Sequence, residues 1–82
     1  MKYRRMGRTG LQVSPMALGS SILYPDDSNA DVGIACINRA FEAGINLFDT
    51  ADAYEAGQTE RVLGRALQEL PREQVVVATK CW

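Results

Sequence analysis

Three short runs of apolar residues have the length and composition of strands buried in a sheet. They cover residues 15–19, 45–49 and 74–79. The last run contains Val75-Val76-Val77, a continuous β-branched series that is typical of a strand covered on both faces. Because Pro15 lacks an amide donor, it fits only at the start or on the edge of the first strand.

Two segments between these runs carry apolar residues at helical spacing. The pattern predicts one helix over residues 31–43, with Gly44 where a glycine commonly ends a helix. It predicts a second helix over residues 58–70, which Pro71 prevents from continuing. The apolar face of the first helix comprises Cys36, Ile37, Ala40 and Phe41, and that of the second comprises Val62, Leu63, Ala66, Leu67 and Leu70. We expect the second face to be part of the core rather than a partner surface.

The N-terminal residues are interpreted as a hairpin. Two extended segments flank Gly7-Arg8-Thr9-Gly10, and glycine accepts the positive φ angles of tight turns, so we predict a hairpin over residues 2–13. The same four residues fit the GXXG loop that clamps nucleic acid in KH domains. That loop joins two helices within a basic surface, whereas here it precedes a strand in a slightly acidic chain, so we favour the hairpin.

The order of elements after the hairpin is strand, helix, strand, helix, strand. Short connections in this order indicate parallel strands joined by right-handed crossovers, and hence an α/β fold. The pattern suits the first three strands of a (β/α)8 (TIM) barrel, which needs about 250 residues in total, so residues 1–82 would form only the first part of one barrel domain. A doubly wound sheet is the alternative, although no G-x-G-x-x-G motif follows the first strand.

Composition narrows the function classes. Nine basic and ten acidic side chains leave a net charge of -1, so no basic patch indicates nucleic-acid binding. No apolar run is long enough for a membrane span or a signal peptide, and a cytoplasmic location is the default expectation. The chain has no histidine, which excludes Ser-His-Asp and Cys-His catalysis by this chain alone. Cys36 and Cys81 have no metal-ligand spacing, so we expect both to be packing residues and expect no metal site.

Polar side chains follow the ends of the predicted strands, where barrel enzymes place their functional groups. Asp49 ends the second strand, Tyr54 lies in the loop after it, and Lys80 ends the third. Taken singly, the aspartate suits a turn cap, the tyrosine a packing residue and the lysine a solvated charge. Their joint position on neighbouring strands, which lie about 5 Å apart, favours one shared site.

The chemistry of such a group follows from its charges. Lys80 buried beside Asp49 would stay charged, because the carboxylate offsets the cost of desolvation. An ammonium close to the Tyr54 phenol stabilises the phenolate, which makes the tyrosine a better proton donor near neutral pH. A tyrosine of this kind can protonate a developing alkoxide if a nicotinamide cofactor supplies a hydride to the carbonyl carbon.

These three residues and the segments around them resemble a known family. Residues 48–54, Phe-Asp-Thr-Ala-Asp-Ala-Tyr, followed by Gly57, Glu60 and Leu63-Gly64, closely resemble the aldo-keto reductase signature. Ala78-Thr79-Lys80 resembles the segment that bears the family's lysine. Residues 3–14 are similar to members related to potassium-channel β subunits and bacterial sugar-aldehyde reductases, so the resemblance covers essentially the whole chain.

The resemblance implies an NADPH-dependent reductase of aldehydes or ketones, with NADH as the alternative cofactor. It implies that Tyr54 is the general acid, that Lys80 tunes it and that Asp49 holds Lys80. The implied cofactor-binding residues are Gly19, Ser20, Ser21 and Asp49, and the implied substrate-binding residues are Tyr54 and Trp82. Ser21 departs from the aromatic residue that is common at its position.

The resemblance also bears on partners and on completeness. It implies a small carbonyl substrate, no nucleic acid and no membrane insertion, and it leaves room for a homo-oligomer. The family's catalytic histidine comes from the next strand and is not among these residues, so we expect the 82-residue chain to be a fragment that is inactive alone. A cofactor-binding, redox-sensing regulatory subunit, like the channel β subunits, is the alternative function.

Overall fold

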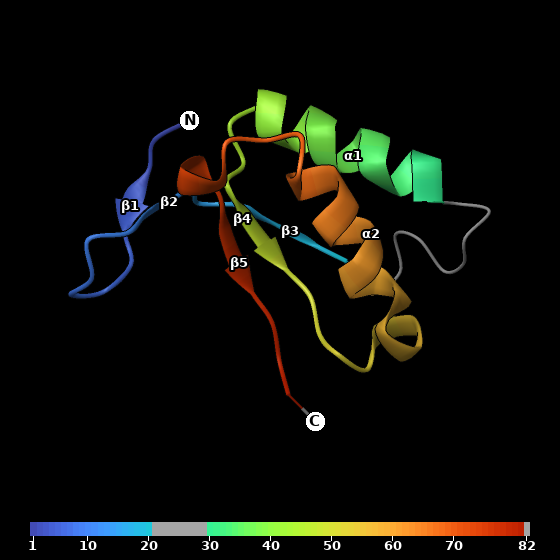
Figure 1. Cartoon of the computed structure of the whole chain (residues 1–82). Helices are drawn as coiled ribbons and strands as arrows, with labels where there is room; N and C mark the ends of the chain where they lie inside the picture. Colours follow the sequence, from blue (N-terminus) through green and yellow to red (C-terminus); the bar gives the residue numbers. More distant parts are fainter. Residues whose placement is uncertain (21–29, 82) are drawn as a thin grey trace.

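The computed structural model describes residues 1–20 and 30–81. Figure 1 shows a small antiparallel hairpin, a three-stranded parallel sheet and two helices. The hairpin strands are β1 (Arg4–Arg5) and β2 (Gln12–Val13), and the sheet strands are β3 (Ala17–Gly19), β4 (Leu47–Asp49) and β5 (Val76–Ala78). The helices are α1 (Ala30–Glu42) and α2 (Gln58–Leu67), with short 3-10 turns at Tyr54–Gly57 and Arg72–Gln74.

The sheet has the strand order β3-β4-β5, with both neighbouring pairs parallel. Leu18, Phe48 and Val77 lie in one row across the sheet, and the core that surrounds them is built from both helices. Both crossovers therefore place their helix on the same face, as Figure 1 shows. A doubly wound sheet has helices on both faces, so the arrangement favours the barrel-type alternative.

Strand alternation separates the core from the opposite face of β4. Phe48 is 1% exposed and packs with Ile37 of α1 and with Val62 and Leu63 of α2. Because successive side chains of a strand point to opposite faces, Asp49 lies on the other face, which no described helix covers. Strand β4 thus contributes Phe48 to the core and Asp49 to the face that no described helix covers.

The end of α1 confirms the role predicted for Gly44. Its φ is +105°, the amide of Gly44 donates to Phe41 O at 3.0 Å, and the amide of Ile45 donates to Ala40 O at 3.0 Å. This is the Schellman pattern, in which a left-handed residue lets the chain cap the last helical carbonyls.

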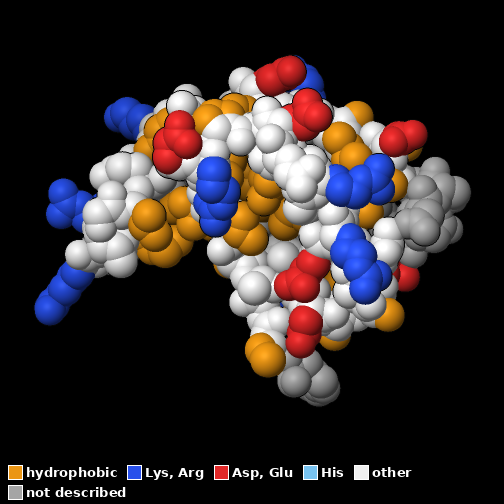
Figure 2. Space-filling model, in the orientation of Figure 1, with side chains coloured by type: hydrophobic (Ala, Val, Ile, Leu, Met, Phe, Trp, Pro, Cys, Tyr) orange, Lys and Arg blue, Asp and Glu red, His pale blue; other side chains and the backbone are white. Residues whose placement is uncertain are grey.

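The hairpin is fastened to the start of the sheet by Asn46, which sequence analysis did not single out. Its side chain accepts a hydrogen bond from the amide of Ser14 at 2.8 Å and donates one to Gln12 O at 2.8 Å. The hydroxyl of Tyr3 donates to Gly44 O at 2.6 Å. A hollow of about 680 Å³ lies between the hairpin and the sheet, and Figure 2 shows apolar side chains gathered over this region.

Some sequence-based expectations differ from the structure. Cys36 and Cys81 are exposed rather than packed. The buried stripe of α1 runs through Ala30, Gly33 and Ile37 and leaves Cys36 outside it, whereas Cys81 lies beyond the end of β5. The third strand starts at Val76, not at residue 74, because Arg72–Gln74 forms a 3-10 turn. After α2 the chain forms a tighter turn, in which the amide of Leu70 donates to Leu67 O. The helix therefore ends three residues before the predicted end.

The Val75-Val76-Val77 run is also less covered than its composition suggested. Val75 is 4% exposed, whereas Val76 and Val77 are half-buried. Helices cover one face of β5, and within residues 1–20 and 30–81 no helix covers the other. In the described part of the chain, no helix is both long and apolar enough to cross a membrane.

Candidate active site

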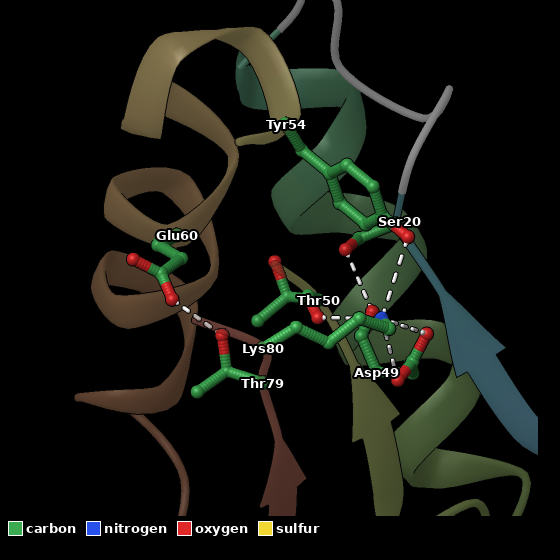
Figure 3. Close-up of polar contacts among 7 residues, drawn as sticks. All are labelled: Ser20, Asp49, Thr50, Tyr54, Glu60, Thr79 and Lys80. Atoms are coloured by element: carbon green, nitrogen blue, oxygen red, sulfur yellow. Dashed lines mark hydrogen bonds and ion pairs between the residues drawn. The ribbon is translucent and has the colours of Figure 1, made fainter. Parts of the chain in front are cut away.

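The carboxyl ends of the three parallel strands meet at one edge of the sheet. Gly19 is in register with Asp49, and Asp49 is in register with Ala78. Lys80 follows two residues after Ala78, and the amide of Thr50 donates to Ala78 O at 2.8 Å, which keeps β4 and β5 together beyond the last strand pair. The strand ends therefore bring the predicted aspartate and lysine to the same edge, as Figure 3 shows.

The ammonium group of Lys80 is the centre of this cluster. It lies 3.3 and 3.2 Å from Asp49 Oδ1 and Oδ2, 2.9 Å from the backbone oxygen of Thr50 and 3.4 Å from the hydroxyl of Tyr54. An ammonium has three N–H donors and no acceptor, so three groups of acceptors use its full donor capacity. The lysine is thus oriented by contacts in three directions.

The charge state of Lys80 follows from these contacts. Desolvation lowers its pKa, but hydrogen bonds to Tyr54 and Asp49 and the charge of Asp49 raise it more, so the net pKa lies above the ordinary value of 10.5. The side chains of Lys80 and Asp49 are 54% and 42% exposed, so the ion pair is not buried as the sequence suggested. The described helices cover one face of the sheet, and the pair lies on the other.

Tyr54 reaches the lysine from a sharply turned segment. Its amide donates to Ala51 O, and its ring centroid lies 5.2 Å from Lys80 Nζ. The next residues, Glu55, Ala56 and Gly57, have φ angles of 48°, 52° and 92°. Non-glycine residues rarely adopt this left-handed conformation, and such strain is often found at functional sites. The turn places the phenol over the strand ends and then starts α2.

The proposed cofactor positions differ in what their side chains do. Ser20 is 3% exposed, and its hydroxyl donates to the backbone oxygen of Asp49 at 2.7 Å, so it joins the ends of β3 and β4. A Cβ atom at Gly19 would meet nothing within 4 Å, so the space beside this backbone is open. Ser21 and Trp82 lie outside the described residues.

Several contacts at this edge involve residues to which the sequence assigned no role. Thr50 offers its backbone oxygen to Lys80, a contact that residue type does not reveal. The amide of Asp52 donates to Lys80 O at 3.2 Å. Thr79 donates to Glu60 at 2.5 Å, and Glu60 belongs to the family-like motif although the sequence assigned it no role in the site. Across residues 1–20 and 30–81, no group of three or more metal-ligating side chains could hold a metal ion.

Comparison with known proteins settles the family. A family model described as "Aldo/keto reductase family" matches residues 15–82. The chain belongs to the aldo-keto reductases. It is 42% identical over 86 aligned positions to the NADH-specific methylglyoxal reductase of Escherichia coli (strain K12), with 99% of this chain and 26% of that protein aligned.

Solved aldo-keto reductases have the same local fold. The holo form of aldo-keto reductase AKR11C1 from Bacillus halodurans superposes with a TM-score of 0.87 at 34% identity, over 99% of this chain and 26% of that one. The aldo-keto reductase from Klebsiella pneumoniae in complex with NADPH gives a TM-score of 0.79 at 27% identity, over 85% of this chain and 24% of that one. These aldo-keto reductases are (β/α)8 barrels, so the parallel sheet described above is the first part of a barrel and not a closed one. The chain spans about a quarter of the length of the curated relatives it matches.

Proposed function

We propose that the full-length protein carrying these residues reduces aldehydes or ketones to alcohols with a nicotinamide cofactor, and that Asp49, Tyr54 and Lys80 are catalytic. The observation that carries the proposal is the contact of the Lys80 ammonium with both the Asp49 carboxylate and the Tyr54 hydroxyl at the ends of adjacent strands. Membership of the aldo-keto reductase family supports the same class of chemistry.

The direction of the hydrogen bonds assigns each residue a task. Lys80 donates to the phenolic oxygen of Tyr54, which leaves the phenol's own proton free to be donated to the oxygen of a substrate carbonyl. As negative charge develops on that oxygen, Tyr54 transfers its proton, and the nearby ammonium stabilises the phenolate that remains. Asp49 keeps the ammonium in place through two short contacts. A bound nicotinamide cofactor supplies the hydride for the carbonyl carbon.

We propose NADPH as the cofactor, with NADH as the alternative. Relatives support both choices, since one is named an NADH-specific reductase and another was solved in complex with NADPH. The residues that would line the site are Gly19, Ser20, Ser21 and Asp49. The open space beside Gly19, on the same uncovered face as Asp49, fits a large ligand that approaches the backbone closely. Trp82, together with Tyr54, is proposed to face the substrate.

The test uses the full-length protein that carries these 82 residues. Turnover of methylglyoxal and of an aromatic aldehyde is followed by loss of reduced-cofactor absorbance. Tyr54→Phe should lower kcat by about 10²- to 10⁴-fold, the usual contribution of a general acid, while cofactor affinity is kept.

Tyr3→Phe is the matched control, because it removes a tyrosine hydroxyl whose partner, Gly44 O, lies at the opposite end of the sheet. It should leave kcat unchanged. Equal turnover by Tyr54→Phe and the parent protein would refute the role of the tyrosine. Tight cofactor binding without measurable turnover in the parent protein would instead favour the regulatory-subunit function.

A further inference from the structure

Lys80 lies two residues beyond the end of β5. The last residue of β5 is Ala78, and its pairing with Asp49 is the last in the register of β4 and β5. The lysine side chain is 54% exposed, so packing against neighbours does little to fix it. Its orientation must therefore come from polar contacts of the residues around it.

Two contacts hold the backbone of this extension. The amide of Asp52 donates to Lys80 O at 3.2 Å. The hydroxyl of Thr79, the residue before Lys80, donates to the Glu60 carboxylate at 2.5 Å, a shorter bond that joins two side chains. Hydrogen bonds to an ionised acceptor are shorter and stronger than neutral ones. Glu60 thus anchors the side chain of Thr79, directly before Lys80.

The position of Glu60 links the lysine to the tyrosine. Glu60 lies in the first turn of α2, directly after the turn Tyr54–Gly57. Figure 3 shows Glu60 and Thr79 on one side of the lysine chain, with Tyr54 and Asp49 around its ammonium. The contacts form a closed path that runs from Tyr54 through the start of α2 to Glu60, across to Thr79 and Lys80, and back to the Tyr54 hydroxyl.

We propose that the Glu60–Thr79 hydrogen bond is a positioning device that sets the distance between Lys80 and Tyr54. The proposal rests on the proposed function, because it names residues that act through the catalytic pair. Among the described residues, the ammonium bonds to Asp49, Thr50 and Tyr54 and not to Glu60 or Thr79, so the effect of this pair is on placement and not on proton transfer itself. A displacement of about 1 Å in such a group can cost about a hundredfold in rate.

The experiment compares four substitutions in the same full-length reductase. Glu60→Ala removes the acceptor, Thr79→Val removes the donor with little change of shape, and Thr79→Ser keeps the donor. Glu69→Ala is the control, since Glu69 is an exposed glutamate just beyond the end of α2. For each we measure kcat, KM, thermal midpoint and the dependence of kcat on pH.

Glu60→Ala and Thr79→Val should each lower kcat by about tenfold with KM changed by less than about twofold, as expected when only the transition state is affected. Both should also shift the alkaline limb of the kcat profile, because the proton donor Tyr54 loses its fixed contact with the Lys80 ammonium. Thr79→Ser should have a kcat within about twofold of the parent value and the pH profile of the parent, and Glu69→Ala should change neither.

A fall in thermal midpoint without a change in kcat or in the pH profile would overturn the proposal, since it would mark the bond as purely structural. Equal changes of kcat and of its pH profile in Thr79→Val and Thr79→Ser would overturn the proposal as well. If Glu60→Ala does not fold, the pair of Thr79 variants decides alone. Tyr54→Phe is measured in parallel: if it retains turnover, the proposed function has failed, whereas loss in Tyr54→Phe with normal Glu60 and Thr79 variants rejects only the positioning role.

Discussion

The turn that carries Tyr54 ends at Gly57, whose backbone makes a quantitative prediction. Gly57 has φ 92° and ψ -9°, and an added Cβ would meet nothing within 4 Å, so any cost of Gly57→Ala comes from the backbone alone. A left-handed conformation costs a non-glycine residue about 1–2 kcal/mol. Alanine recovers about 0.4–1 kcal/mol by restricting the unfolded chain, so the net loss of stability should be about 1 kcal/mol.

Gly64 is the matched control for this change. It lies inside α2, has no positive φ, and an added Cβ there also meets nothing within 4 Å. Alanine in a helix interior is favoured over glycine by about 0.8–1 kcal/mol, so Gly64→Ala should stabilise the protein. The same methyl group should thus have opposite effects at two positions seven residues apart, with a difference of about 2 kcal/mol.

The assay is thermal unfolding of the two variants in the full-length reductase. For a domain of its size, 1 kcal/mol shifts the midpoint by about 2–4 °C, so the two variants should melt about 4–8 °C apart. Gly57→Ala should also lower kcat, because strain in the turn displaces Tyr54 relative to Lys80. Equal midpoints, or a higher midpoint for Gly57→Ala than for Gly64→Ala, would refute the reasoning about this turn.

Two further predictions concern pH and the isolated chain. Because the folded-state pKa of Lys80 lies above 10.5, its ion pair contributes fully to stability below that pH and loses its contribution as the pH rises through the folded-state value. Urea unfolding should therefore show parent and Lys80→Met proteins differing near pH 8 and converging as the pH rises beyond 10.5; a constant difference would contradict this. In residues 1–20 and 30–81 no helix covers one face of the sheet, Met16 is 63% exposed, and a hollow of about 680 Å³ is lined partly by apolar side chains. We expect the isolated chain to aggregate or to unfold without a cooperative transition, and a steep calorimetric melt of that chain would show otherwise.

Much of the fold is readable from the sequence because it depends on local rules. The apolar runs, the helical stripe of α2 and the glycine after α1 each follow from the chain's own periodicity. Cys36 shows the limit of such rules: it lies within one turn of Ile37 and Ala40, but which part of a broad apolar arc faces the sheet is decided by the packing of α1 against α2. Tertiary contacts of this kind are not encoded in periodicity.

The candidate site likewise has features that the sequence predicts and features that it does not. Asp49 and Lys80 could be placed together because parallel strands bring their carboxyl ends to one edge. The contact of Lys80 with the backbone oxygen of Thr50 could not be predicted, and neither could the left-handed turn after Tyr54, since neither depends on a recognisable residue type. The exposure of the ion pair was also missed, because burial depends on parts of a barrel that these residues do not supply.

The central claim is that Lys80 and Tyr54 act as one proton-donating unit, and a double-mutant cycle tests it most directly. The values of kcat/KM are measured for the parent reductase, Tyr54→Phe, Lys80→Met and the double variant. If Lys80 acts only through the tyrosine it contacts at 3.4 Å, the double variant should be no slower than Tyr54→Phe alone. Losses that multiply in the double variant would show that the two residues act independently and would contradict the claim.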